Sequence, residues 1–294
     1  MDETGISAFL GVIIGGLFVL TAVSVIIIGP ILIFRDIFNY FYKEYINKYV
    51  QFIPIKNKYK KVLEDYSLYY YQLNDNEKKI FERRVQKFIN MKEFVPRGNL
   101  ERVTDEMKAL IASTAIQITF GHPNVYFSHF WKILVYQDDY YSTISQQYHQ
   151  GEVHTKGLIV LSWKSFVRGF MNRTDGRNLG LHEMAHALHL ENAIQNDEYD
   201  FIDFDALLKF HAIANEEIPL IRSGESNFFR EYAGTNVHEF FAVVVENFFE
   251  RPREFYESHA NIYQITCLVL NQNPLKLIGW FSDLVNGGIC AVVE

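Results

Sequence analysis

The sequence predicts an α+β protein: a mainly helical domain with a small β-sheet, preceded by one transmembrane helix. A long uncharged apolar run occupies residues 6–34, and helical patterns dominate from about residue 62 onward. Two stretches rich in β-branched and aromatic residues, 132–141 and 155–163, lie between the predicted helices. Helices, then strands, then a further helix is an order typical of the α+β class.

Length and composition narrow the possibilities further. The 294 residues suffice for one large or two small domains. The aromatic share of 16% is high, which indicates either a membrane part or an aromatic-rich core. A net charge of -7 gives no electrostatic support for a nucleic-acid partner. Cys267 and Cys290 form no disulfide framework, so we expect free or buried thiols in a reducing compartment.

The apolar run from Ile6 to Phe34 contains no charged residue. A helix needs about 20 apolar residues to cross the hydrocarbon core, so this run is long enough. A signal peptide would have a basic start and a shorter apolar stretch, whereas Asp2 and Glu3 make this start acidic. The pattern therefore predicts a retained membrane anchor.

The flanking charges predict the direction of this anchor. No Lys or Arg precedes it, and seven follow it: Arg35, Lys43, Lys48, Lys56, Lys58, Lys60 and Lys61. Because positive residues stay on the cytoplasmic side, we expect a single-pass membrane protein whose large C-terminal part is cytoplasmic. The predicted division is an anchor at 1–34, a basic juxtamembrane segment at 35–61 and one domain at 62–294.

Helix and strand signals place the elements of this domain. Asn74 or Asp75 can cap a helix through about residue 94, and Thr104 can cap a second one that stops at Gly121. The apolar run 158–163 predicts a strand. This strand is either an edge strand that pairs with an extended peptide or a fully buried one, and the pattern alone favours neither.

The stretch GLHEMAHALHLEN, residues 180–192, carries the strongest chemical signal. On a helix His182 and His186 lie one turn apart on the same face and can both bind one ion. Glu183 follows the first histidine and can take a proton from a metal-bound water, which is the H-E-x-x-H pattern of zinc hydrolases. The alternative is an amphipathic helix with surface histidines, but this face is unusually apolar.

His189 is a tempting third ligand. It lies seven residues after His182, a rise of about 10.5 Å along the helix axis. Three imidazoles spread along one straight helix converge poorly on a tetrahedral ion, and no glycine breaks this helix. We therefore expect the third ligand to come from another element.

A second predicted helix, capped by Asn236 and running to about Phe249, offers that ligand. It is largely apolar yet carries carboxylates on one side, and buried carboxylates need partners. Metal binding by Glu239 with support from Glu246 would supply them. Alternatively, Asn236 and Glu239 form a capping box that satisfies only the helix start. Spacing alone leaves both interpretations open.

Three stretches in this order, 151–163, 175–189 and 232–252, resemble the Mlc titration factor A family of zinc-dependent peptidases. That family is similar in its catalytic core to lethal-factor-type gluzincins, and the resemblance covers most of residues 62–255. It implies a zincin-like fold and one Zn²⁺ ion bound by His182, His186 and Glu239. It also implies Glu183 as the catalytic base and Tyr232 as the phenol that stabilises the oxyanion or donates a proton.

The chain departs from the family in three ways. An acidic residue is usual at the position of His189, and Glu191 or Asp197 are candidates to replace it. Tryptophan is common at the position of His154. The typical member is soluble, whereas an anchor is predicted here.

The expected function is therefore peptide-bond hydrolysis by a zinc-activated water, with a peptide or protein as substrate and no nucleic-acid partner. Aminopeptidase and endopeptidase activity are not distinguished. The alternative is a non-catalytic or weakly catalytic regulatory protein that sequesters a transcriptional repressor or another protein partner, as the resemblance suggests. A purely structural zinc site would use four protein ligands with cysteine, and no cysteine lies near the motif.

Overall fold

The computed structural model describes residues 30–31, 34, 53–142 and 146–277. The chain divides into two compact units, Met1–Ile53 and Pro54–Glu294. Almost all of the first unit, including most of the predicted anchor, lies outside the described residues. The fold and the site below belong to the second unit.

The prediction of a single-pass membrane protein with a cytoplasmic domain has to be corrected. Within the described ranges, no helix is both long enough and apolar enough to cross a membrane. The longest of these helices, α9 (Phe204–Ser223), has 20 residues but carries charged side chains such as Lys209 and Glu216. A spanning helix needs about 20 predominantly apolar residues, which α9 does not provide.

The first part of the second unit is helical, as predicted. It contains α3 (Asn57–Tyr66), α4 (Leu68–Gln72), α5 (Asp75–Met91) and α6 (Asp105–Ile118). The predicted caps are confirmed: the Asn74 side chain accepts hydrogen bonds at the start of α5, and Thr104 accepts one from Met107 N at the start of α6. Helix α6 ends three residues before Gly121, at Ile118.

A four-stranded sheet follows, in the order β1 (Glu93–Arg97), β2 (Lys132–Tyr136), β6 (Leu158–Ser162) and β5 (Gly151–His154). The first three strands are parallel and β5 is antiparallel to β6. A separate antiparallel pair joins β3 (Tyr140–Ser142) and β4 (Gln147–His149). Strand β6 is interior and mostly buried, so the edge-strand interpretation of residues 158–163 is wrong and β5 forms the edge.

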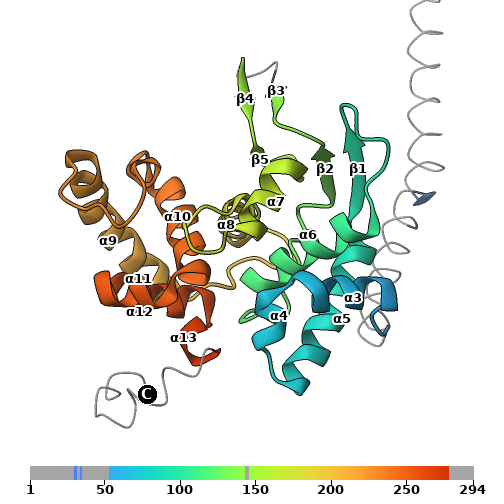
Figure 1. Cartoon of the computed structure of the whole chain (residues 1–294), viewed down its shortest axis with the longest axis horizontal. Coiled ribbons are helices and arrows are strands. Elements are labelled where there is room, and N and C mark those ends of the chain that lie inside the picture. Colours follow the sequence, from blue (N-terminus) through green and yellow to red (C-terminus); the bar gives the residue numbers. More distant parts are fainter. Residues whose placement is uncertain (1–29, 32–33, 35–52, 143–145, 278–294) are drawn as a thin grey trace, which may run out of the picture. The chain divides into compact units, whose positions relative to one another are not determined.

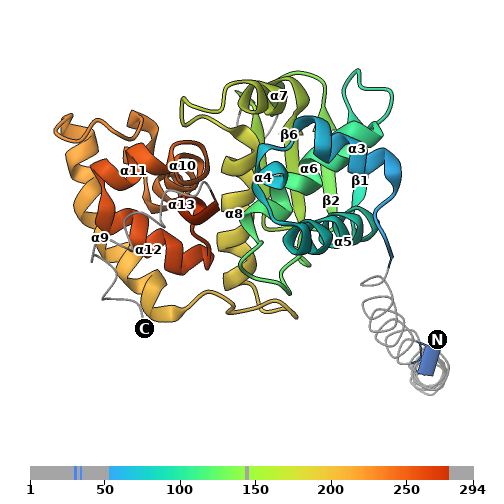
Figure 2. The same ribbon diagram turned by 60° about the horizontal axis from the view of Figure 1, so that its bottom comes forward.

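The remaining elements are helical. They are α7 (Trp163–Met171), α8 (Leu179–Ala193), α9, the 3₁₀ helix η2 (Glu231–Gly234), α10 (Val237–Glu250), α11 (Pro252–Ser258), α12 (Ala260–Leu270) and α13 (Pro274–Leu277). Helix α8 lies between the sheet with its helices and the C-terminal helices (Figure 1 and Figure 2). It packs against α6, α7, α10, β5 and β6, which explains why it is buried nearly all round.

The core of this unit is rich in aromatic rings. Its largest fully buried side chains include Phe81, Phe88, Phe127, Phe130, Phe166, Phe210, Phe240, Phe241, Phe248, Phe255 and Tyr263. The high aromatic share of the sequence is therefore used for packing, as one of the two interpretations predicted. Cys267 on α12 is a free thiol, as predicted, and Cys290 lies outside the described residues.

Candidate metal centre

Helix α8 presents two histidines one turn apart. The Asn178 side chain caps the helix by accepting a hydrogen bond from Leu181 N at 3.0 Å. The rings of His182 and His186 are nearly perpendicular, with centroids 4.7 Å apart. Their Nε2 atoms are 3.1 Å apart. The two imidazoles therefore point their Nε2 atoms at the same place.

Helix α10 brings a carboxylate to that place. Glu239 lies in its first turn, and its Oε2 is 3.1 Å from His182 Nε2 and 3.4 Å from His186 Nε2. Asn236 caps the helix by accepting from Glu239 N at 3.0 Å. No return bond from Asn236 N to the Glu239 carboxylate occurs among the described residues, whereas α5 has a complete capping box. Glu239 therefore faces the histidines and not its own helix start.

The three donor atoms fit a divalent cation. They all lie within 4.8 Å of one another. Ligands about 2.1 Å from a tetrahedral ion stand about 3.4 Å from each other, close to the separations observed here. Glu239 Oε2 is buried and has no hydrogen-bond partner in the described part of the chain. A buried carboxylate oxygen without a partner is costly, and a cation between the three groups would remove that cost.

The tautomer of His182 strengthens this fit. Its Nδ1 lies 2.7 Å from Glu246 Oε1, so the ring N–H is directed to that carboxylate and Nε2 keeps its lone pair. Burial lowers the pKa of His182, but Glu239 and Glu246 outweigh burial and raise it to about 9, so at neutral pH and without a metal a proton would lie between His182 Nε2 and Glu239 Oε2. Burial raises the pKa of Glu239, whereas the imidazoles of His182 and His186 facing its Oε2 hold it well below its usual range. The site therefore has a strong affinity for positive charge.

Glu183 is buried beside the three candidate ligands. A Cβ atom at Gly151 of β5 would come 2.5 Å from Glu183 Oε1, so the strand backbone closes over this carboxylate. Burial raises the pKa of Glu183 to about 7, against the lowering effect of positive charge at His182. A carboxylate with a pKa near neutrality can both accept and release a proton.

Tyr232 lies in η2 at the opening of the site. Its side chain is 49% exposed, and its ring centroid is 5.9 Å from that of His182. Burial of the hydroxyl group and the negative charge of Glu239 raise the pKa of Tyr232 to about 12. The phenol therefore keeps its proton at neutral pH and can donate a hydrogen bond.

All five predicted site residues line one cavity of about 440 Å³. They are His182, Glu183, His186, Tyr232 and Glu239. The edge strand β5 borders the same cavity through Gly151, Glu152 and Val153. Sequence positions more than fifty residues apart are thus brought together between a strand edge and two helices.

Sequence reasoning missed two residues that hold the ligand set in place. Arg230 donates to both oxygens of Glu246, each at 2.7 Å, and Asn178 N donates to Glu246 Oε2 at 2.7 Å. Glu246, which was expected to support the site, also accepts a hydrogen bond from His182 Nδ1 through its Oε1. Nothing in the spacing of Arg230 or Asn178 indicates these contacts, because each depends on how a loop folds back.

His189 lies near the site but outside the group of three. Its ring stacks on that of His211, with centroids 5.9 Å apart, and meets that of His238 edge-on, with centroids 4.8 Å apart. Burial and the neighbouring imidazoles lower the pKa of His189 to about 4. Glu191, a candidate to replace the family's acidic residue, instead accepts hydrogen bonds from His129 N and Asn196 Nδ2. His154, where the family commonly has tryptophan, pairs with Glu152 at 3.2 Å.

A family model described as glucose-regulated metallo-peptidase M90 matches residues 42–269. The chain belongs to this family. The resemblance drawn from the sequence motifs is confirmed, and membership in this metallopeptidase family implies a divalent metal. The His182, His186 and Glu239 group is where the described structure offers ligands for one.

Individual relatives agree with this assignment. An uncharacterized protein of Synechocystis is 26% identical over 228 residues, which cover 72% of this chain and 82% of the relative. Mlc titration factor A of Cronobacter sakazakii is 27% identical over 229 residues, which cover 69% and 82%. Mlc titration factor A of Escherichia coli is 30% identical over 140 residues, which cover 45% of this chain and 52% of that protein.

Proposed function

We propose that this chain is a zinc-dependent peptidase in which His182, His186 and Glu239 bind the ion. The observation that carries the proposal is the meeting of three donor atoms at 3.1 to 3.4 Å. One of them is a buried carboxylate oxygen without a partner among the described residues. Membership in a metallopeptidase family supports the same conclusion.

Glu183 is the proposed general base. When bound, zinc supplies a Lewis acid that polarises the scissile carbonyl and acidifies water. Glu183 accepts the proton of the attacking water and then delivers it to the leaving amine. Its pKa of about 7 suits both directions of proton transfer at neutral pH.

Tyr232 and the Glu246 carboxylate have separate roles in this proposal. The Tyr232 phenol donates a hydrogen bond to the oxyanion that forms at the substrate carbonyl. Glu246, fixed by Arg230 and Asn178, orients His182 through its Nδ1. Such outer contacts fix the ring plane and the tautomer of a metal-binding histidine.

An extended peptide is the proposed substrate. Strand β5 is a sheet edge and therefore has main-chain N–H and C=O groups that a further strand can pair with. Because β5 also borders the cavity, a peptide paired with it would pass the three ligands. Comparing peptides with free and acetylated N-termini distinguishes an aminopeptidase from an endopeptidase, since only the latter cleaves both.

The test uses the full chain with a peptide panel, with and without chelator. Glu183→Gln should keep the zinc content of the wild type and lower the cleavage rate by about 10²- to 10⁴-fold. Glu254→Gln, an exposed change on α11, is the matched control and should leave the rate unaltered. A cleavage rate in Glu183→Gln equal to that of the wild type would contradict the assignment of Glu183 as the general base.

Capture of a protein partner is a second candidate function. It is favoured by the names of the Cronobacter and Escherichia relatives, which describe them as titration factors of Mlc. Cleavage-deficient Glu183→Gln separates the two functions. A regulatory protein would bind its partner equally well with this change, and the chelator-sensitive hydrolysis of peptides would be absent from the wild type.

A further inference from the structure

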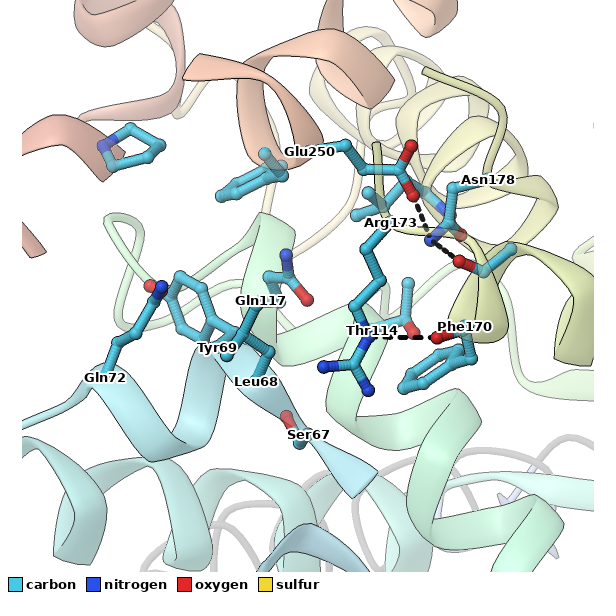
Figure 3. A pocket seen from close by; sticks show the side chains of 14 residues that line it. Ser67, Leu68, Tyr69, Gln72, Thr114, Gln117, Phe170, Arg173, Asn178 and Glu250 are labelled. Atoms are coloured by element: carbon cyan, nitrogen blue, oxygen red, sulfur yellow. Dashed lines mark hydrogen bonds between the residues drawn. The ribbon is translucent and has the colours of Figure 1, made fainter. Parts of the chain in front are cut away.

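Two cavities of the second unit differ in their relation to the edge strand β5. The cavity shown in Figure 3, of about 80 Å³, is lined by both Arg173 and Glu250, and none of its lining residues lies on β5. The larger one, of about 440 Å³, is bordered by β5 and contains the proposed ligands. Among the described residues that line this larger cavity, three are acidic and none is Lys or Arg. The larger cavity therefore favours a positively charged occupant.

Two of the three acidic residues already have partners in the proposed mechanism. Glu239 binds the ion, and Glu183 exchanges a proton with water. The third, Glu152 of β5, has no role there. Its Oε2 lies 3.2 Å from His154 Nε2 and accepts from the Tyr140 hydroxyl group at 3.4 Å. Neither of these two partners is a permanent cation, so they orient the carboxylate without neutralising it.

The strand register places the side chain of Glu152. This residue lies directly opposite Val160 of β6, whose side chain packs with Tyr140 in a small separate core cluster. Residues directly opposite each other in an antiparallel pair share one face of the sheet. The Glu152 side chain is therefore on the Tyr140 face, in agreement with its contact to that hydroxyl group. A substrate residue paired with Glu152 at the free edge of β5 would have its side chain on the same face.

Glu152 also lies close to the proposed base. A Cβ atom on its neighbour Gly151 would come 2.5 Å from Glu183 Oε1. Consecutive Cα atoms are about 3.8 Å apart, so a substrate residue opposite Glu152 lies beside the one that faces Glu183. Burial contributes most to the raised pKa of Glu183, and the negative charge of Glu152 adds to it. Glu152 is thus placed to contact a substrate residue next to the reacting bond.

We propose that Glu152 selects substrates with a Lys or Arg side chain next to the scissile bond. This inference rests on the proposed peptidase function and names its substrate class. Opposite charges on directly opposite residues of neighbouring strands attract each other, and like charges there repel. The ammonium group at the N-terminus of a peptide is another source of positive charge, so the peptides must separate the two.

The test uses the zinc-loaded full chain and alanine-based peptides with acetylated and amidated ends. One residue is Lys, uncharged norleucine or Glu, placed at successive positions, and mass spectrometry identifies the cleaved bond. Lys should raise kcat/KM by about two- to fivefold over norleucine, and Glu should lower it. The cleaved bond should move with the Lys residue. Equal kcat/KM for the three kinds of peptide would overturn the proposal.

Charge variants locate the selection. Glu152→Gln should remove the preference for Lys, and Glu152→Lys should reverse it in favour of the Glu peptides. A merely structural role of Glu152 would not produce this reversal. Glu254→Lys, an exposed change on α11, alters the charge equally and should keep the preference for Lys. A preference for Lys that persists in Glu152→Lys would assign the selection to another group and contradict the proposal.

A readout without turnover separates this inference from the peptidase proposal. Fluorescence anisotropy with labelled peptides and the cleavage-deficient Glu183→Gln should give a Kd about two- to fivefold lower for the Lys peptide than for the norleucine peptide. This binding preference without cleavage by the wild type would contradict the peptidase proposal alone. Cleavage without a charge preference would contradict the role of Glu152 alone.

The N-terminal ammonium group is tested with the norleucine peptides, with and without acetylation. The proposal expects Lys to act in the acetylated peptides, where this ammonium group is absent. A preference for free N-termini, with no effect of Lys in acetylated peptides, would assign the positive charge to the N-terminus and overturn selection of a side chain.

Discussion

At the scale of single residues, the site depends on groups whose charges do not balance without a cation. His182 directs its Nδ1 to Glu246, so in the neutral ring the Nε2 lone pair faces Glu239 Oε2 at 3.1 Å. Two acceptors at that distance repel each other unless a proton or a metal ion lies between them. The geometry of this pair is thus the strongest residue-level support for a metal.

Gly151 provides a test of the base at this scale. In Gly151→Ala the new methyl group would approach Glu183 Oε1 to 2.5 Å and push the carboxylate away. We expect the cleavage rate to fall by at least about tenfold, because proton transfer requires hydrogen-bond reach. Zinc content should stay at the wild-type level, since no ligand moves. A rate equal to wild type in steady-state assays would contradict the proposed position of the base.

Arg230 provides a test of the outer contacts. Arg230→Gln removes the paired hydrogen bonds to Glu246 and should weaken zinc affinity by about 10- to 100-fold, measured by chelator competition. Arg83→Gln is the matched control, because Arg83 is exposed and, within the described residues, its side chain donates only to Lys79 O of its own helix. Equal zinc affinity in Arg230→Gln and Arg83→Gln would exclude a positioning role.

The raised pKa of Glu250 predicts a pH dependence of stability. The ordinary value is 4.5 and burial raises it to about 7, so the folded protein holds a proton that the unfolded chain has lost between these values. This contribution to stability is complete below pH 4.5 and is lost as the pH rises through 7. Urea unfolding of wild type and Glu250→Gln should show it. The stability of the wild type relative to the variant should decline over that window, and a constant difference would contradict the shift.

At the scale of elements, helix starts and the helix with the H-E-x-x-H pattern could be predicted, but the sheet could be predicted only in part. The caps Asn74, Thr104 and Asn236 are local signals and coincide with the observed starts. Strands β1 and β5 are short and owe their form to partners far along the chain. Glu93 pairs with Lys132 and Gly151 pairs with Leu161, and such register is not encoded in any local pattern.

The same distinction applies to the site. The H-E-x-x-H pattern is local, so α8 could be predicted to supply His182 and His186. The choice between a ligand and a capping role for Glu239 required the approach of α10 to α8, which is tertiary information. Arg230 and Asn178 reach Glu246 from loops, and no periodic pattern carries that contact.

The two roles of Asn178 can be separated with a second cap. Asn178→Ala and Asn74→Ala each remove a helix N-cap and should each lower the free energy of unfolding by about 1 kcal/mol in urea titrations. Only Asn178→Ala should also weaken zinc binding, because losing this cap loosens the start of α8, where the Asn178 backbone N–H donates to Glu246 Oε2. Equal effects of the two changes on zinc affinity would show that Asn178 acts only as a helix cap and does not help to position the ligands.

At the scale of the whole molecule, the high aromatic share correctly indicated an aromatic core. The apolar run at residues 6–34, in contrast, led to a wrong prediction of localisation. Part of the high aromatic share is used in the core of the second unit, where Phe81 is fully buried and lies 5.7 and 5.8 Å from the rings of Tyr69 and Phe120. Local hydropathy in residues 6–34 predicted a single-pass protein, and the described helices contain no spanning segment.

The aromatic core predicts a strong dependence of stability on single rings. Phe81→Ala should lower the free energy of unfolding by about 3 to 5 kcal/mol, since it leaves a cavity among packed rings. Tyr71→Ala is the control, because Tyr71 is 74% exposed and its loss should alter stability by less than about 0.5 kcal/mol. Equal midpoints of these two variants in urea would contradict the proposed core.

The central claim concerns the metal and its three ligands, and elemental analysis of purified full-length protein tests it most directly. The account predicts one zinc ion per chain in the wild type and none in Glu239→Ala, with Glu254→Ala, an exposed change on α11, retaining the ion. Undiminished zinc content in Glu239→Ala would contradict the ligand set.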